Sequence, residues 1–149
     1  MLRRVTLLLL MFCSVTVYAA EGTTYTDGKV NYYPLKPDFI ANLRGGGKRI
    51  HFTKVAVQVM TRDTAVIRAI EENGPAVRHA LLMLLSNQTY DAMRDVQKRE
   101  EVRLEAMEQL KSVLAELAGI SDEKKIEDAD GKKHPSGIQA IYFTDFVIQ

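Results

Sequence analysis

Apolar residues in the first half of the main region alternate in the way expected of strands. Tyr32–Leu43 and Ile50–Met60 are rich in aromatic and β-branched residues, and the glycine-rich segment Arg44–Arg49 separates them. This order predicts two antiparallel strands joined by a flexible turn. Pro34 and Pro37 each remove a backbone donor, so the first strand is expected to be an edge strand or to be interrupted.

The alternation in the second strand slips by one position. Ile50 and Phe52 share one face of an extended chain, whereas the opposite face carries Val55, Val57 and Val59. One extra residue in the strand would bring both groups to the same side. The pattern therefore predicts a β-bulge near Thr53–Lys54.

Helical periodicity follows this strand and predicts three helices. The first begins after a cap at Thr61 or Asp63 and continues to about Glu72. Its apolar side consists of Val66, Ile67, Ala69 and Ile70. The second is expected over Pro75–Ser86, because proline is well tolerated at the first position of a helix. The third is expected over Tyr90–Ala118.

The second and third helices differ in how much of their surface is apolar. Leu81–Leu85 is apolar on every side, which predicts a central, buried helix with Leu82 inside the core. The third helix has one apolar stripe, formed by Leu104, Met107, Leu110, Leu114 and Leu117. Three aspartates are expected at helix starts, where the helix dipole favours a carboxylate: Asp63, Asp91 and Asp95.

The last part of the chain predicts a loop and a final strand. Ser121–Ser136 is charged and contains glycine and proline, which is typical of a loop. Ile138–Ile148 is apolar at both odd and even positions, which predicts a strand in the middle of a sheet covered on both faces. The whole order predicts an α+β fold, in which a small antiparallel or mixed sheet packs with three helices.

The first residues have the pattern of a secretory signal peptide. Arg3 and Arg4 precede the apolar stretch Val5–Thr16, and small residues lead to an expected cut between Ala19 and Ala20. The alternative is a short membrane anchor, but the stretch is shorter than the roughly 20 apolar residues of a membrane span. We therefore expect a signal peptide over residues 1–19, a polar linker over 20–31 and one domain over 32–149.

Composition limits the classes of partner. Lys and Arg number 20 against 19 Asp and Glu, so the net charge of +1 gives no general attraction to nucleic acid. The one cysteine, Cys13, lies in the segment expected to be removed, so we expect no disulfide in the mature chain. Any partner must be recognised by shape and by local patches.

No arrangement of residues in the sequence predicts catalysis or cofactor binding. His51, His79 and His134 have no metal-ligand spacing, and Glu127–Gly131 lacks the first and last ligands of a calcium loop. The Gly45–Gly47 triplet lacks the flanking residues of a phosphate-binding loop. We therefore expect no catalytic residue, no metal or cofactor site and no small-molecule substrate.

Three segments resemble the flagellar basal-body-associated FliL family. An apolar helix ends in Ser-Asn-Gln-Thr-Tyr within Asn73–Tyr90, Tyr32–Leu43 looks like that family's first strand, and Ile141–Gln149 looks like its closing strand. The resemblance covers residues 32–149. It implies an SPFH or stomatin-like periplasmic domain at the inner membrane.

The resemblance also implies partners. Members of the family associate with the flagellar stator and basal body and support swimming, swarming and chemotaxis without enzymatic activity, and self-association into a homo-oligomer is expected. They usually keep an amino-terminal transmembrane anchor, from which the predicted cut departs. The alternative hypothesis is an SPFH-like scaffold or adaptor at the inner membrane with no flagellar role.

Overall fold

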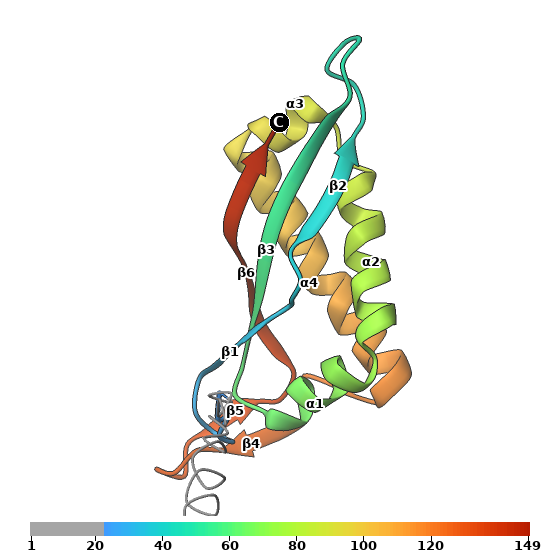
Figure 1. The fold of residues 1–149 in the computed structure, drawn as a ribbon. Helices are drawn as coiled ribbons and strands as arrows, with labels where there is room; N and C mark the ends of the chain where they lie inside the picture. The colour runs from blue at the N-terminus through green and yellow to red at the C-terminus, as the bar shows by residue number, and fades with distance from the viewer. Residues whose placement is uncertain (1–22) are drawn as a thin grey trace, which may run out of the picture.

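One long strand, β3 (His51–Thr61), pairs with three others to make the main sheet (Figure 1). The computed structural model describes residues 23–149. β6 (Ile138–Ile148) pairs with one edge of β3, and the other edge pairs with β1 (Asn31–Pro34) and β2 (Phe39–Leu43) in succession. All three pairings are antiparallel. The expected interruption of the first strand is confirmed, because the segment with Pro37 separates β1 from β2.

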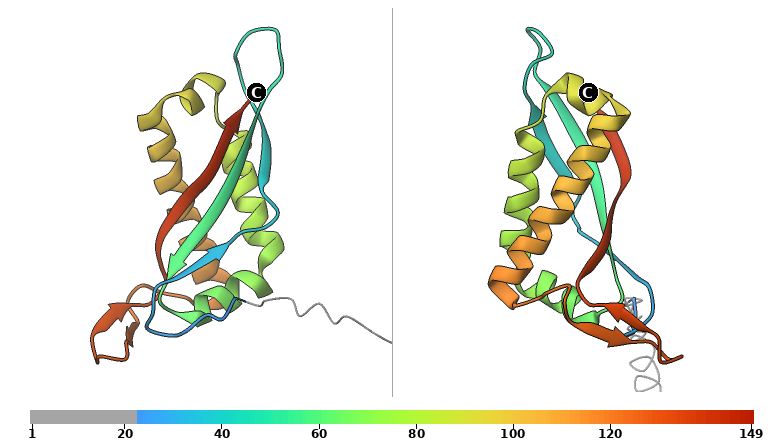
Figure 2. Two further views of the ribbon diagram at one scale, coloured as in Figure 1. Left: turned by 60° about the vertical axis from the view of Figure 1, so that its left-hand side comes forward. Right: turned by 180° about the vertical axis from the view of Figure 1, so that it is seen from behind.

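The helices form a second layer on one side of this sheet (Figure 2). Their bounds are α1 (Thr64–Glu72), α2 (Gly74–Ser86), α3 (Tyr90–Arg94) and α4 (Val96–Ala118). A small hairpin, β4 (Lys125–Glu127) with β5 (Lys133–Pro135), lies at the end where the described chain begins, opposite the carboxyl terminus. The α+β class is confirmed. None of the helices within residues 23–149 is long and apolar enough to cross a membrane.

The bulges of the sheet lie in β6, so the bulge predicted near Thr53–Lys54 is wrong. The register of β3 with β6 shifts twice, which leaves Thr144 and Gln139 without a partner residue on β3. Each extra residue reverses the alternation and returns apolar side chains to the helix side. The β6 residues on this side pair with the buried row of β3 or pack against the core: Ile138, Ile141, Phe143, Phe146 and Ile148.

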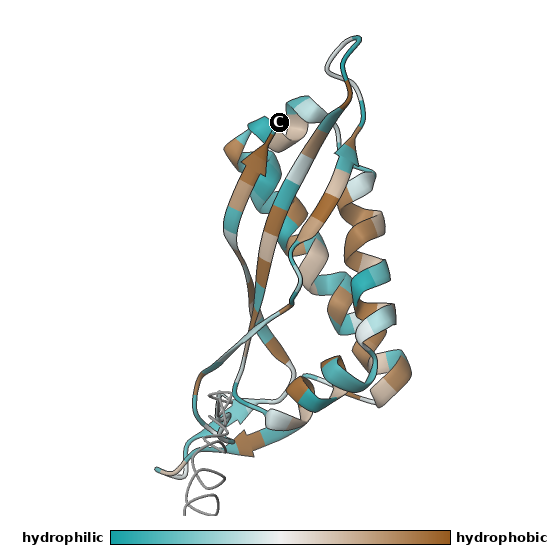
Figure 3. Ribbon diagram, viewed as in Figure 1, coloured by the Kyte–Doolittle hydropathy of each residue, from teal (hydrophilic) through white to brown (hydrophobic). Residues whose placement is uncertain are grey.

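β6 is therefore an edge strand with one buried face, and the prediction of a central strand covered on both faces is wrong. Its opposite face leaves Tyr142 and Val147 largely exposed. The two bulges make a one-sided strand look two-sided, because a count of odd and even positions assumes an unbroken alternation. Figure 3 shows the alternation of hydrophobic and hydrophilic residues along β3 and β6.

The expected third helix is two helices. Asp95 is extended at φ −77° and ψ 129°, and its carboxylate accepts from the backbone N–H of Lys98, so α3 ends there and α4 begins. Asp63 likewise caps α1, and Asp91 lies in the first turn of α3, so the helix-start prediction is confirmed for all three aspartates. The described chain thus has four helices.

The buried stripe of α4 differs from the predicted one. Leu104 and Leu117 are exposed, whereas Leu110 and Leu114 are buried as predicted. The buried residues recur every fourth position: Val102, Ala106, Leu110 and Leu114. Rows at this spacing are the ridges that helices use when they pack.

α2 buries one side only, so the prediction of a helix surrounded by core is wrong. Leu81, Leu84 and Leu85 are buried, but Leu82 is 41% exposed and Met83 is 58% exposed. In a two-layer domain the helix layer has an outer surface, and an apolar residue on that surface meets solvent. The segment Ser121–Ser136 also differs from a plain loop, because it contains the β4–β5 hairpin.

Residues near the start of the described chain pack against the domain, although they belong to the segment expected to be a linker. The Asp27 carboxylate accepts hydrogen bonds from the backbone N–H and the hydroxyl of Thr64, at 2.8 and 2.6 Å. Gly28 has φ 78°, and a Cβ there would lie 2.6 Å from the Cα of Asp128. These contacts fix the segment to the amino terminus of α1 and to the hairpin.

A buried polar cluster fixes the same end of the sheet. The Thr61 hydroxyl donates to the carbonyl of Gly137 at 2.8 Å, and the Ser136 hydroxyl donates to the Asp63 carboxylate. The other oxygen of Asp63 accepts from the backbone N–H of Ala65 at 2.8 Å. Since each of these buried groups has a partner, their hydrogen bonds offset the cost of desolvation, and the cluster joins β3, α1 and the residues just before β6.

Leu81→Ala and Leu82→Ala should differ sharply in stability. Leu81 is 1% exposed, so its truncation should cost about 2–5 kcal/mol, whereas Leu82 is 41% exposed and should cost about 1 kcal/mol or less. Urea denaturation followed by circular dichroism measures both. Equal losses would contradict the one-sided burial of α2.

Asp27→Asn tests the contact with α1 through its pH dependence. The hydrogen bonds from Thr64 hold the pKa of Asp27 below its ordinary value of 3.8. A lowered carboxyl pKa stabilises the fold above the ordinary value, and the contribution is lost as the pH falls through the lowered pKa. Because Asp27 is exposed and solvent screens its interactions, the wild type should exceed the variant by no more than about 0.5 kcal/mol at pH 7, and the two should converge in acid.

Thermal unfolding between neutral pH and pH 3 measures this difference. Asp130→Asn, in the exposed hairpin turn, is the matched control and should follow the wild type throughout. A gap between wild type and Asp27→Asn that is the same at every pH would contradict the assignment.

Candidate interaction surface

The histidines do not converge on a common site. His51 stacks on Tyr90 with ring centroids 4.0 Å apart, His134 lies 2.9 Å from the Asp128 carboxylate, and His79 is exposed on α2. No group of three potential metal ligands gathers anywhere in residues 23–149. The predicted cleavage residues Ala19 and Ala20 lie outside the described residues.

The acidic segment Glu127–Gly131 forms the turn of the β4–β5 hairpin. Asp128 accepts from the backbone N–H groups of Asp130 and Lys132, at 3.0 and 2.8 Å, and its other oxygen faces His134. The hydrogen bond with His134, followed by that from Lys132, lowers the pKa of this carboxyl. The carboxylate is thus used within the turn, as expected of an Asx turn rather than a cation loop.

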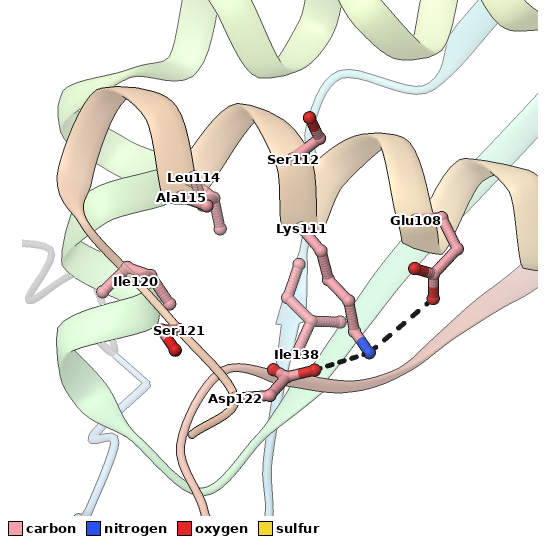
Figure 4. Close-up of a pocket in the computed structure, with 9 residues that line it drawn as sticks. All are labelled: Glu108, Lys111, Ser112, Leu114, Ala115, Ile120, Ser121, Asp122 and Ile138. Carbon is pink, nitrogen blue, oxygen red and sulfur yellow. Dashed lines mark ion pairs between the residues drawn. The ribbon is translucent and has the colours of Figure 1, made fainter. Parts of the chain in front are cut away.

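A pocket at the end of α4 is held by ion pairs (Figure 4). It has a volume of about 380 Å³, and Lys111 points between Asp122 at 2.8 Å and Glu108 at 3.7 Å. The hydrogen bond to Asp122 raises the pKa of Lys111. Lys111 thus fastens α4 to the segment that follows it through its ion pair with Asp122.

The face of the sheet opposite the helices carries several exposed apolar side chains. We call it the open face; it comprises Tyr32, Ile40, Phe52, Met60, Tyr142 and Val147. Ile40 is 63% exposed and Tyr32 is 50% exposed. The helices lie on the other side of the sheet in both views of Figure 2. A gathering of exposed apolar side chains of this kind marks a protein contact surface.

Aromatic contacts order one end of the open face. The rings of Tyr32 and Tyr142 lie 6.1 Å apart, on the two strands that flank β3. The Tyr142 hydroxyl lies 3.8 Å from the sulfur of Met60, which stands between them on β3. Tyrosine and methionine are residue types enriched at protein interfaces, since they combine large contact area with adaptable packing.

Paired charges occupy the middle of the open face. Lys54 lies 3.0 Å from Asp38 and 3.9 Å from Asp145, so it links both flanking strands to β3. Hydrogen bonds from Lys36 and Lys54 lower the pKa of Asp38, and the bond to Asp38 raises the pKa of Lys54. The charges thus compensate one another locally, which leaves recognition to shape and apolar contact.

The open face was missed in the sequence because the bulges of β6 hide which residues share a side. The clearest signal was in β2, where Phe39, Ala41 and Leu43 are buried while Ile40 and Asn42 are exposed. Ile40 is a surface residue only if helices cover one face of the sheet. The sequence does not show whether helices cover one face or both, so the exposure of Ile40 could be inferred only from the fold.

Comparison with known families identifies the domain. The family model described as flagellar basal body-associated protein FliL matches residues 32–149. The chain belongs to the FliL family. The match contains every residue of the open face, and it confirms the resemblance seen in the sequence.

A curated relative agrees with this assignment. The chain is 24% identical over 117 residues to the flagellar protein FliL of Aquifex aeolicus (strain VF5). The alignment covers 78% of this chain and 60% of the relative, so this FliL-family chain spans less than two thirds of the relative's length.

Proposed function

We propose that this FliL-family chain is a non-enzymatic component of the flagellar basal body that associates with the torque-generating stator. Membership of a basal body-associated family supports the setting. The open face supports action through contacts, because it presents apolar and aromatic side chains without a set of reactive groups. The role is to sustain swimming, swarming and chemotaxis when the motor works against load.

The proposed location is the periplasm, at the inner membrane and the basal body. We include self-association of the SPFH-like domain in the proposal, because a protein without catalysis acts through binding. The flanking strands β1, β2 and β6 bring the open-face residues together on one surface. Such a surface can dock on a second protein without unfolding any part of the domain.

Loss of the gene should leave filaments assembled and weaken swimming, most strongly in viscous medium. The physical reason is that a stator under greater load needs more support from its neighbours. Motility in soft agar with and without added polymer measures this effect. Unchanged motility at every viscosity, with no stator recovered in a pull-down, would overturn the flagellar role and favour an adaptor at the inner membrane.

A double variant tests the open face within the same assay. Ile40→Ser with Tyr142→Ser should fail to restore motility and should recover less stator protein, because both side chains lie on the proposed contact surface. Leu82→Ser is the matched control, since Leu82 is also exposed but lies on the helix layer. Equal rescue by the two proteins would remove the open face from the proposal.

Cell fractionation and amino-terminal sequencing test the location. A mature protein that begins at Ala20 should appear in the periplasmic extract, because residues 1–19 have the pattern of a cleaved signal peptide. A full-length species in washed inner membranes would instead establish the family's usual anchor.

A further inference from the structure

The outer edge of β6 carries backbone groups that are not used by the sheet. Phe52 and Gln149 exchange both backbone hydrogen bonds, each at 2.9 Å. Antiparallel pairs alternate along a ladder, so Val147 also faces β3, whereas the N–H and C=O of Phe146 and Ile148 point to the opposite edge. No other strand pairs with this edge within residues 23–149.

The same orientation holds beyond the bulge at Thr144. Arg103 of α4 donates to the carbonyl of Ile141 at 2.8 Å, which places that carbonyl on the outer edge. Phe143, two residues further, then points the same way. Arg103 thus covers one end of the edge, and the backbone of Phe143, Phe146 and Ile148 stays open.

A groove runs beside this edge, between β6 and the first half of α4. Its larger part has a volume of about 930 Å³ and contains Arg103, Phe143 and Phe146. Its smaller part, of about 390 Å³, contains Arg94 and Ile148. The two parts share Arg99 and Phe146, so they adjoin each other along the strand.

The groove is basic as well as apolar. Three arginines line it, Arg94, Arg99 and Arg103, against one carboxylate, Glu100, which pairs with Arg103. None of the ion pairs found in residues 23–149 includes Arg94 or Arg99. Their guanidinium groups lie over aromatic rings, 5.5 Å from the centroid of Tyr90 and 4.9 Å from that of Phe146.

We propose that this groove binds an extended acidic peptide segment of a partner, which adds a strand to the free edge of β6. The open N–H and C=O groups bind the peptide backbone, as in recognition by strand addition. Arg94 and Arg99 bind carboxylates on alternate side chains, because a guanidinium group forms paired hydrogen bonds with a carboxylate. The side chains between them point to the other face of the sheet, beside Tyr142 and Val147.

Charge argues against a second copy of the chain at this edge. A two-fold pairing of β6 with β6 would bring the same surface of both copies together. Arg94 and Arg99 of each copy would then face like charges in one groove. A lone phosphate or lipid headgroup would match the arginines, but it would leave the donors and acceptors of the strand edge unused. The groove shares Tyr142 with the open face, but its arginines and the strand edge lie outside that face, so this inference does not rest on the flagellar role.

Binding can be measured with the full chain and synthetic peptides. The probe is a labelled peptide of about eight residues that alternates Glu with Val, long enough to pair with β6 from Ile141 to Ile148. Two matched control peptides are used. In one, every Glu is replaced by Lys, and in the other, alternate backbone nitrogens are methylated. The acidic peptide should bind, and each matched peptide should bind at least about tenfold more weakly, as should the acidic peptide in high salt.

Variants test the arginines. Arg94→Gln with Arg99→Gln should weaken binding of the acidic peptide by about tenfold or more, whereas Arg68→Gln, on the exposed side of α1, should leave it unchanged. Arg99 also donates to the carbonyls of Met93 and Arg94, so Arg94→Gln alone provides a variant that leaves those bonds intact. This single variant should weaken binding severalfold without a change in melting temperature.

Hydrogen exchange gives a readout that does not depend on variants. The acidic peptide should slow exchange of the amides of Phe143, Phe146 and Ile148, because they would become bonded to the added strand. Binding without this protection, or binding that the arginine variants do not weaken, would overturn the proposal.

Two further results would show that the groove binds something other than an acidic peptide. Arginine-dependent binding to phosphatidylglycerol vesicles or to inorganic phosphate, with no binding of the peptide, would assign the groove to a phosphate group. Dimerisation of the full chain in sedimentation experiments, with protection of the same three amides, would assign it to a second copy.

Discussion

The fold depends on the pairing of β3 with every other strand of the main sheet. Its inward row must be buried throughout, and the five residues of that row are at most 2% exposed: Thr53, Val55, Val57, Val59 and Thr61. β1 and β2 share one edge of this strand, and β6 takes the other. The two bulges of β6 follow from this constraint, because without them its apolar residues would alternate between core and solvent.

The helices cover only one face of the sheet, and this asymmetry creates the surfaces available for binding. The open face has apolar side chains around a neutral group of ion pairs at Lys54. The edge of β6 differs from it, because its groove combines unused backbone groups with arginines. The two surfaces proposed for contact therefore differ in chemistry, although they share Tyr142.

Local hydrogen bonds join the elements at the end with the hairpin. Thr61, Asp63 and Ser136 are buried and hydrogen-bonded to one another or to nearby backbone groups. Asp27 adds the first described residues to the same cluster through Thr64.

Features set by neighbouring residues were determined by the sequence alone. Asp63 and Asp95 were recognised at helix starts because a carboxylate satisfies N–H groups within its own turn. The glycine turn after β2, the interruption between β1 and β2 and the bounds of β6 also follow from local chemistry. The family resemblance came from segments of this kind, and the family match confirms it.

Features set by distant residues were decided only by the tertiary structure. The exposure of Leu82 depends on what packs beside α2. The end of α3 at Asp95, within a segment predicted to be one helix, was seen only in the structure. The open face and the groove depend on which side of β3 the helices cover and on which strand remains at the edge. The physical reason is that a residue is buried only where another helix or strand packs against it. An apolar residue has the same chemistry in the core and at a contact surface, so its type alone does not tell the two apart.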